Sequence, residues 1–309
     1  MGIGYTSNEV QVVINDKDTY PNLPQAMVKD GLINSNAYSL WLNDLDANTG
    51  SILFGGVDTE KYHGKLETLP VQKVNGEYSQ LIIALTDVTF KSTSSYHRYS
   101  TSALPAAVLL DSGSTLTYLP NYLVEDIYKD LPIVYDSLSG VGYVPCNLIN
   151  DNINITYTFS SPEITVNIKE LIINAGDLHF RDGTRACVFG IAPAGGSTAV
   201  LGDTFLRSAY VVYDLANNEI SLATTNFDST TSNILEIGGT GNNIPGATPV
   251  SNPVTSVAVG GSGARIGGIT GSGTISTQVP SEGASTRVFV PIVTLEQLVV
   301  SLICWWYLL

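Results

Sequence analysis

One stretch of this 309-residue chain is the most informative about its structure: Ala107-Val-Leu-Leu-Asp-Ser-Gly-Ser-Thr115. An apolar run typical of a buried strand leads directly into Asp111 and a glycine-containing turn. Gly113 permits a tight turn whose backbone N–H groups can donate hydrogen bonds to the carboxylate, which orients it for acid–base chemistry. The neighbouring hydroxyls can donate as well: Ser112, Ser114 and Thr115. Asp-Ser-Gly is also common in ordinary turns, so this stretch alone leaves both interpretations open.

The composition narrows the class of protein. The chain carries 14 Lys+Arg against 28 Asp+Glu, which gives a net charge of −14. This acidity argues against nucleic-acid binding, which needs clustered basic residues, and against a polybasic membrane patch. The three Cys and three His residues show no metal-binding spacing. We therefore expect neither a metal ion nor a cofactor.

A second motif favours the catalytic interpretation of the first. It is Ala199-Val-Leu-Gly-Asp-Thr-Phe-Leu-Arg207, followed by Tyr210-Val-Val-Tyr-Asp214. Together with Asp111-Ser-Gly-Ser114, this pattern resembles the C-terminal lobe of pepsin-like aspartic endopeptidases. In that family each lobe supplies one Asp, and an apolar-apolar-Gly segment crosses behind it. The resemblance implies that Asp111 is catalytic, that the four residues after it support it or face substrate, and that Gly202 ends the crossing segment.

The resemblance covers residues 1–227 and implies a mainly β, pepsin-like acid protease fold. Residues 1–50 resemble a remnant of the N-terminal lobe, and residues 51–227 resemble the C-terminal catalytic lobe. Short β-branched and aromatic runs bounded by Gly, Asn, Asp and Ser agree with a β-rich chain. Apolar residues at helical spacing predict two helices, within 22–31 and 120–131.

The sequence departs from the family in one respect, because it contains a single Asp-Ser/Thr-Gly motif. Family members use two carboxylates that share one proton around a water molecule, and they are the standard case of like charges about 3 Å apart that cannot both ionise. We expect the full-length product to be an aspartic endopeptidase that acts on peptides or proteins, and this chain to be incomplete and inactive alone. We expect a monomer; a homodimer that combines two copies of Asp111 is an alternative, although residues 1–50 belong to the other lobe.

Two other functions stay open from the sequence. One is a catalytically inactive, pepsin-like module that binds peptides and is displayed on a stalk. The other is a structural protein of the cell wall.

Charged residues become rare after residue 227. Residues 228–287 are rich in Gly, Ser and Thr and predict a flexible or disordered stalk. Residues 288–309 end in an apolar run of about 12 residues, which is shorter than the roughly 20 that a spanning helix needs. Stalk and tail match the signal for a GPI anchor, so we expect membrane attachment only through a C-terminal lipid; a sticky or marginally anchoring tail is the alternative.

The stalk, the tail and the stretch Asn36-Ala-Tyr-Ser-Leu-Trp-Leu-Asn43 resemble the fungal yapsin-like, GPI-anchored branch of the family. This implies an extracellular or cell-surface location, at the plasma membrane or cell wall. No signal peptide precedes the first lobe, and we expect the natural N-terminus to lie upstream of Met1.

The remaining predicted features suit a secreted protein. The family carries a disulfide in its second lobe, which implies that Cys146 pairs with Cys187; two buried thiols are the alternative. Closing a loop of about 40 residues stabilises the folded state by roughly 4 kcal/mol in the chain-entropy model. Asn154-Ile-Thr156 is the one glycosylation sequon of the sequence.

Overall fold

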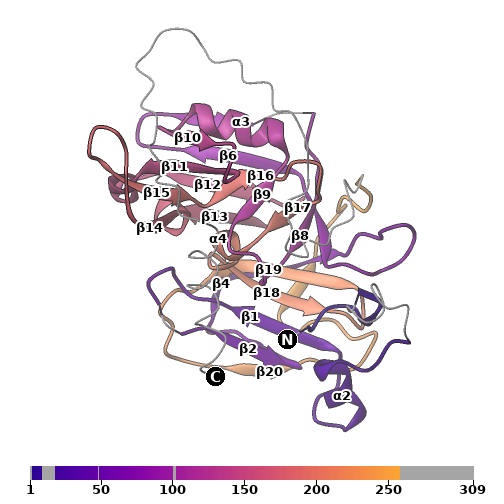
Figure 1. The fold of residues 1–309 in the computed structure, drawn as a ribbon. Helices are drawn as coiled ribbons and strands as arrows, with labels where there is room; N and C mark the ends of the chain where they lie inside the picture. Colours follow the sequence, from indigo (N-terminus) through magenta and orange to yellow (C-terminus); the bar gives the residue numbers. More distant parts are fainter. Residues whose placement is uncertain (1, 9–17, 48, 100–101, 258–309) are drawn as a thin grey trace.

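The computed structural model describes residues 2–8, 18–47, 49–99 and 102–257, and shows a mainly β protein (Figure 1). Residues 258–287 of the predicted stalk and the predicted anchor signal 288–309 lie outside the described residues.

A six-stranded sheet lies across the lower part of Figure 1. Its strands, in spatial order, are β2 (Ser51–Phe54), β1 (Ala37–Trp41), β18 (Ala209–Asp214), β19 (Glu219–Thr225), β4 (Tyr62–Pro70) and β21 (Ala247–Pro249). Strand β1 comes from the predicted N-terminal remnant, yet it pairs with β18, with Ala37 opposite Asp214 and Leu40 opposite Val211. The remnant is therefore built into the same sheet as the C-terminal lobe.

A five-stranded sheet carries the Asp-Ser-Gly stretch. Its spatial order is β16 (Ile191–Pro193), β9 (Thr117–Leu119), β17 (Ala199–Leu201), β8 (Ala106–Leu110) and β5 (Ile82–Leu85). Strand β17 runs parallel to β8, with Leu201 opposite Leu110, and antiparallel to β9. This sheet sets the end of the apolar-apolar-Gly segment beside the end of the strand that precedes Asp111.

Three smaller sheets complete the lobe. The first contains β13 (Glu163–Asn167), β12 (Asn154–Thr158), β6 (Asp87–Lys91) and β7 (Tyr96–Arg98). The second contains β10 (Val134–Asp136), β11 (Val141–Pro145), β15 (Arg185–Phe189) and β14 (Ile172–His179). The third pairs β20 (Ile234–Glu236) with β3 (Gly56–Asp58). One apolar core joins the large sheets, because Leu110, Tyr157, Phe205 and Tyr213 belong to the same buried cluster.

Both predicted helices are confirmed, with shorter bounds. Helix α2 (Leu23–Lys29) begins where the Asn22 side chain accepts a hydrogen bond from the Gln25 N–H at 3.4 Å. Helix α3 (Asn121–Lys129) buries Leu123, Val124 and Ile127. The short elements are α4 (Asp203–Leu206) and the 3₁₀ helices η1 (Thr6–Asn8), η2 (Cys146–Asn150) and η3 (Ile168–Leu171). Within the described residues, no helix has the length and apolar character needed to cross a membrane.

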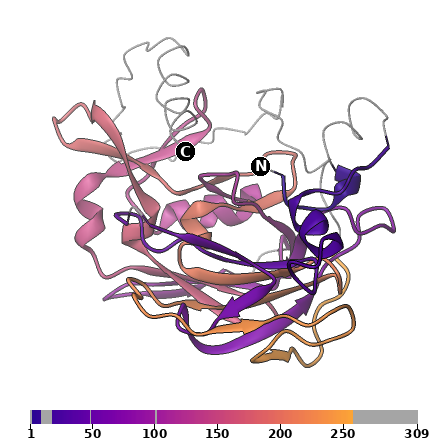
Figure 2. The same cartoon turned by 90° about the horizontal axis from the view of Figure 1, so that it is seen from below.

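The structure corrects the predicted start of the stalk, because residues 228–257 are folded onto the lobe. Strand β20 pairs with β3, and β21 adds to the edge of β4. Figure 2 shows this orange segment beside the violet strands of the N-terminal half. Three of its apolar side chains are buried, Ile237, Ile244 and Val250, whereas Ile234 and Leu235 of β20 are exposed. The prediction relied on composition. A few apolar residues are enough to hold such a segment in place when an existing sheet provides a surface on which they can be buried.

Candidate functional site

Asp111 stands where β8 ends, and its carboxylate is held on both oxygens. Oδ1 accepts a hydrogen bond from the Gly113 N–H at 2.9 Å, and Oδ2 accepts one from the Ser114 hydroxyl at 2.8 Å. The Asp111 N–H donates to the Leu201 carbonyl at 3.1 Å, which fastens the residue to the neighbouring strand β17. The half-buried carboxylate is thus fixed in orientation by its own turn.

The other two predicted neighbours play a different part. Ser112 and Thr115 are exposed, and in the described structure the hydrogen bonds to the Asp111 carboxylate come from Gly113 and Ser114. The Thr115 carbonyl instead accepts the Thr204 N–H at 3.1 Å. Both residues are open to solvent in the turn that follows Asp111.

Gly202 lets the crossing segment lie directly against the Asp111 turn. A Cβ atom at this position would stand 2.3 Å from the Ser114 carbonyl oxygen and 2.4 Å from that of Leu116, which is closer than atoms can approach. The next residue adds a hydrogen bond between the crossing segment and the turn, because the Asp203 N–H donates to the Ser114 carbonyl at 2.8 Å. A residue with a side chain at 202 would force these two segments apart.

Sequence reasoning missed a second carboxylate near Asp111. Asp203 begins α4 and is half-buried. Burial raises its pKa to about 6; the Arg207 guanidinium opposes this rise, and the charge of Asp111 adds to it. No hydrogen bond joins the two carboxylates in the described structure. The one sequence signal was its position directly after the apolar-apolar-Gly segment.

Buried polar contacts lock α4 in place behind the site. The Thr204 hydroxyl oxygen accepts the Thr117 N–H and donates to the Gly190 carbonyl, both at 2.9 Å. Arg207 donates from Nε to the Glu170 carboxylate at 2.7 Å and from Nη2 to the Glu170 carbonyl at 2.6 Å. Both side chains are almost fully buried, and burial raises the pKa of Glu170 against the opposing effect of Arg207. The segment that backs Asp111 therefore has little freedom to move.

The six-stranded sheet also reaches the site. The fully buried Tyr213 of β18 stacks on Tyr38 of β1, with ring centroids 4.8 Å apart. Burial raises the pKa of Tyr213 well above its ordinary value, and the charges of Tyr38, Asp111 and Asp203 add to this. Tyr38, from the predicted N-terminal remnant, thus packs against a residue that lies near Asp111.

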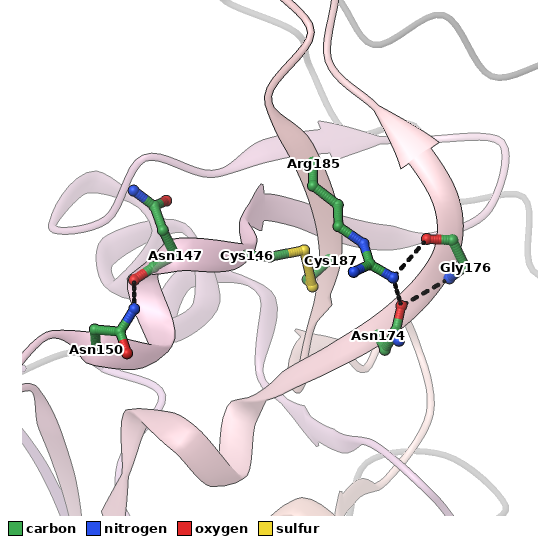
Figure 3. The surroundings of a disulfide bond; sticks show 7 residues. All are labelled: Cys146, Asn147, Asn150, Asn174, Gly176, Arg185 and Cys187. Atoms are coloured by element: carbon green, nitrogen blue, oxygen red, sulfur yellow. Dashed lines mark hydrogen bonds between the residues drawn. A yellow bond between two sulfur atoms is a disulfide. The ribbon is translucent and has the colours of Figure 1, made fainter.

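The predicted disulfide is present, and Figure 3 shows it between η2 and β15. Cys146 and Cys187 are 41 residues apart in sequence, and their Cα atoms are 5.0 Å apart. The sequon residue Asn154 begins β12, where its side-chain oxygen accepts a hydrogen bond from Asn167 Nδ2 at 3.1 Å. Asn154 is half-buried and lies away from Asp111, on a different sheet.

Comparisons with known proteins agree with this geometry. The family model described as eukaryotic aspartyl protease matches residues 1–225. The protein named "Probable aspartic-type endopeptidase opsB" from Aspergillus oryzae is 71% identical over 286 residues, which cover 92% of this chain and 58% of that protein. "Aspartic proteinase yapsin-3" from Saccharomyces cerevisiae is 36% identical over 252 residues, covering 78% of this chain and 48% of that protein.

A solved structure agrees at the level of the fold. The crystal structure of the aspartic proteinase from Irpex lacteus superposes with a TM-score of 0.59 at 21% identity, covering 75% of this chain and 69% of that one. The chain spans about three fifths of the length of its Aspergillus oryzae relative. The match over residues 1–225, the oriented Asp111 and the glycine crossing behind it agree, and the chain belongs to the eukaryotic aspartyl protease family.

Proposed function

We propose that this chain supplies Asp111 as one of the two catalytic aspartates of an endopeptidase that hydrolyses peptide bonds in peptides or proteins. The observation that carries the proposal is the carboxylate of Asp111, which is oriented by Gly113 and Ser114 and backed by the close crossing at Gly202. The exposed Ser112 and Thr115 then border the bound peptide.

The chemistry needs a partner for Asp111. The two carboxylates hold a water molecule between them: the ionised one takes a proton as the water attacks the peptide carbonyl carbon, and the protonated one donates its proton to the carbonyl oxygen. Asp111 is the only Asp in the sequence that is followed by Ser or Thr and then Gly. The second carboxylate therefore comes from outside these 309 residues, and the chain by itself is inactive.

Proteolysis at acidic pH tests this proposal. A longer form that includes a second Asp-Ser/Thr-Gly motif is expected to cleave a denatured protein, and Asp111→Asn is expected to lower kcat by about 10³-fold or more. Asp182→Asn, in an exposed turn, is the matched control and should leave the rate unchanged. Pepstatin-sensitive cleavage by the 309-residue chain as a strict monomer would overturn the requirement for an outside partner.

A second candidate is an inactive module that binds peptides, and the single Asp motif is the observation that favours it. Saturable peptide binding by the longer form, without cleavage at any pH from 3 to 7, would select this alternative. Absence of both binding and cleavage would point to the third candidate, a structural protein of the wall.

We also propose that the protein is a monomeric, secreted or surface glycoprotein held by a C-terminal GPI anchor. The disulfide supports an oxidising compartment, and the 35% identity over 233 residues to the Candida albicans protein named "Secreted aspartic protease 8" supports secretion. Expression in a fungal host tests both modifications: Asn154→Gln should abolish a shift in mass on deglycosylation, and a phosphatidylinositol-specific phospholipase should release the wild-type protein from membranes.

A further inference from the structure

A tight hairpin precedes β5. Val74 and Glu77 exchange both of their backbone hydrogen bonds, at 2.8 and 3.0 Å. Between them, Asn75 and Gly76 have φ angles of 52° and 86°, as a two-residue hairpin turn with left-handed central residues requires. The hairpin therefore has a defined shape and presents a fixed set of side chains.

The pairing of β5 with β8 places this hairpin near Asp111. Ile82 lies opposite Leu109, and the Leu110 N–H donates to the Leu81 carbonyl at 3.1 Å, which continues the same antiparallel register. Continued by one residue beyond the paired strands, this register would bring Gln80 level with Asp111. The hairpin therefore leads directly into the strand that pairs with β8, the strand that ends at Asp111.

Lys73 and Tyr78 share one face of the hairpin, across the strands from each other. The Lys73 ammonium is 4.9 Å from the centroid of the Tyr78 ring, and both side chains are exposed. Among the described residues, no carboxylate lies within 4 Å of this ammonium, although the chain has a net charge of −14. Glu77 belongs to the Val74–Glu77 bridge, so its side chain leaves from the opposite face.

Tyr78 also lies near residues of the predicted N-terminal remnant. Burial raises the pKa of Tyr5, and the nearby Tyr78 hydroxyl adds to this. The Tyr5 hydroxyl donates to Asn218 at 3.0 Å, and the Asn218 carbonyl accepts the Val71 N–H at the base of the hairpin. The pair of Lys73 and Tyr78 therefore lies near Tyr5 of the predicted N-terminal remnant, on the hairpin that leads into β5.

We propose that Lys73 and Tyr78 form a substrate subsite that accepts an acidic side chain of the bound peptide. The inference rests on the proposed function, since it requires an extended peptide beside Asp111. The ring of Tyr78 holds the Lys73 side chain in place and offers an apolar face to the methylene groups of Glu, while the ammonium pairs with its carboxylate. Lys73 acts in specificity and takes no part in bond cleavage.

Because the charge of a Glu side chain depends on pH, the preference of the subsite for Glu over Gln should depend on pH as well. A free Glu side chain has a pKa of about 4.3, whereas Lys stays protonated far above neutral pH. The preference for Glu over Gln is therefore expected at pH 6 and is expected to vanish at pH 3. A purely structural role of Lys73 would give no such pH dependence.

Equilibrium binding of capped hexapeptides carrying a neutral dye tests the subsite, with Glu or Gln placed at each position in turn. At one position, the full chain should bind the Glu peptide roughly two- to fivefold more tightly than the Gln peptide at pH 6, as expected for an exposed ion pair. Lys73→Met should remove this ratio, and Lys73→Arg should retain it. The matched control is Lys91→Met at the exposed end of β6, which removes the same charge elsewhere and should leave the ratio intact.

Equal affinity at every position, a Glu preference that persists in Lys73→Met, or no detectable binding of either peptide overturns the subsite. The proposed function fails by a separate readout, the acid proteolysis of the longer form. Binding with the expected Glu preference but without cleavage would contradict the proposed function and support the subsite. Cleavage without that preference would support the proposed function and contradict the subsite.

Discussion

Asp111 and Asp203 lie close to each other in space, but their carboxylates have different surroundings. Asp111 is supplied with donors on both oxygens by its own turn. Asp203 is instead partly buried, and this burial raises its pKa to about 6. The position of Asp111 was predictable from the local motif, because the donors lie within three residues of it. The pKa of Asp203 was not predictable, because its largest cause is burial, and because Asp111 comes near it only in the folded chain.

The raised pKa of Asp203 predicts a pH-dependent stability. A carboxyl whose pKa is raised by folding binds its proton more tightly in the folded state, so the folded state loses stability as pH rises from about 4 through about 6. Relative to Asp203→Asn, which does not titrate, the wild type should lose about 1–2 kcal/mol between pH 4 and 7, after allowing for solvent screening. Chemical denaturation of both proteins at four pH values checks this; parallel curves would contradict it.

Gly202 is predicted to be intolerant of even a methyl group. In Gly202→Ala the added Cβ would meet two carbonyl oxygens at 2.3 and 2.4 Å, and backbone atoms cannot swing aside as a flexible side chain can. We expect a loss of about 2–4 kcal/mol in the free energy of unfolding, at or above the usual cost of overpacking. Gly196→Ala is the matched control, since a Cβ there meets nothing within 4 Å. Equal midpoints of denaturation for the two variants would refute the steric argument.

Among the helices and strands, the sequence predicted those whose own residues show a clear hydrophobic pattern. Strands β8 and β17 are continuous apolar runs, and α2 and α3 show apolar spacing with recognisable ends. The strands β20 and β21 were missed because each is three residues long and largely exposed or half-buried. They form only because β3 and the edge of β4 offer them backbone partners.

The disulfide between η2 and β15 is predicted to stabilise the lobe. The double variant Cys146→Ser, Cys187→Ser should unfold with a free energy lower by about 2–4 kcal/mol, because the unfolded chain loses a cross-link that closes a loop of 41 residues. Denaturant titration with and without a reducing agent is the measurement. The reductant should destabilise the wild type and leave the double variant unchanged; a wild type indifferent to reduction would contradict the prediction.

At the scale of the whole molecule, distant parts of the chain are joined in one sheet. Strand β1, from the first 50 residues, pairs with β18, and β21, beyond residue 227, pairs with β4. The terminal segment is fastened by polar contacts too, since Lys61 Nζ donates to the Ser229 carbonyl at 2.7 Å and Ser232 donates to Asp58 at 2.7 Å. Such contacts depend on pairings across more than 150 residues, which no local pattern encodes.

The folded state of residues 228–257 can be tested with two isoleucines of the same segment. Ile237 is fully buried beneath the six-stranded sheet with Trp41 and Tyr210, whereas Ile234 in β20 is 57% exposed. Ile237→Ala should lower the free energy of unfolding by about 2–4 kcal/mol through lost burial and a new cavity, and Ile234→Ala by less than about 1 kcal/mol. A flexible stalk would tolerate both changes equally, because neither side chain would then contact the lobe. Unfolding of the full chain followed by tryptophan fluorescence separates the two cases, since Trp41 packs in the same cluster as Ile237 and reports the loss directly.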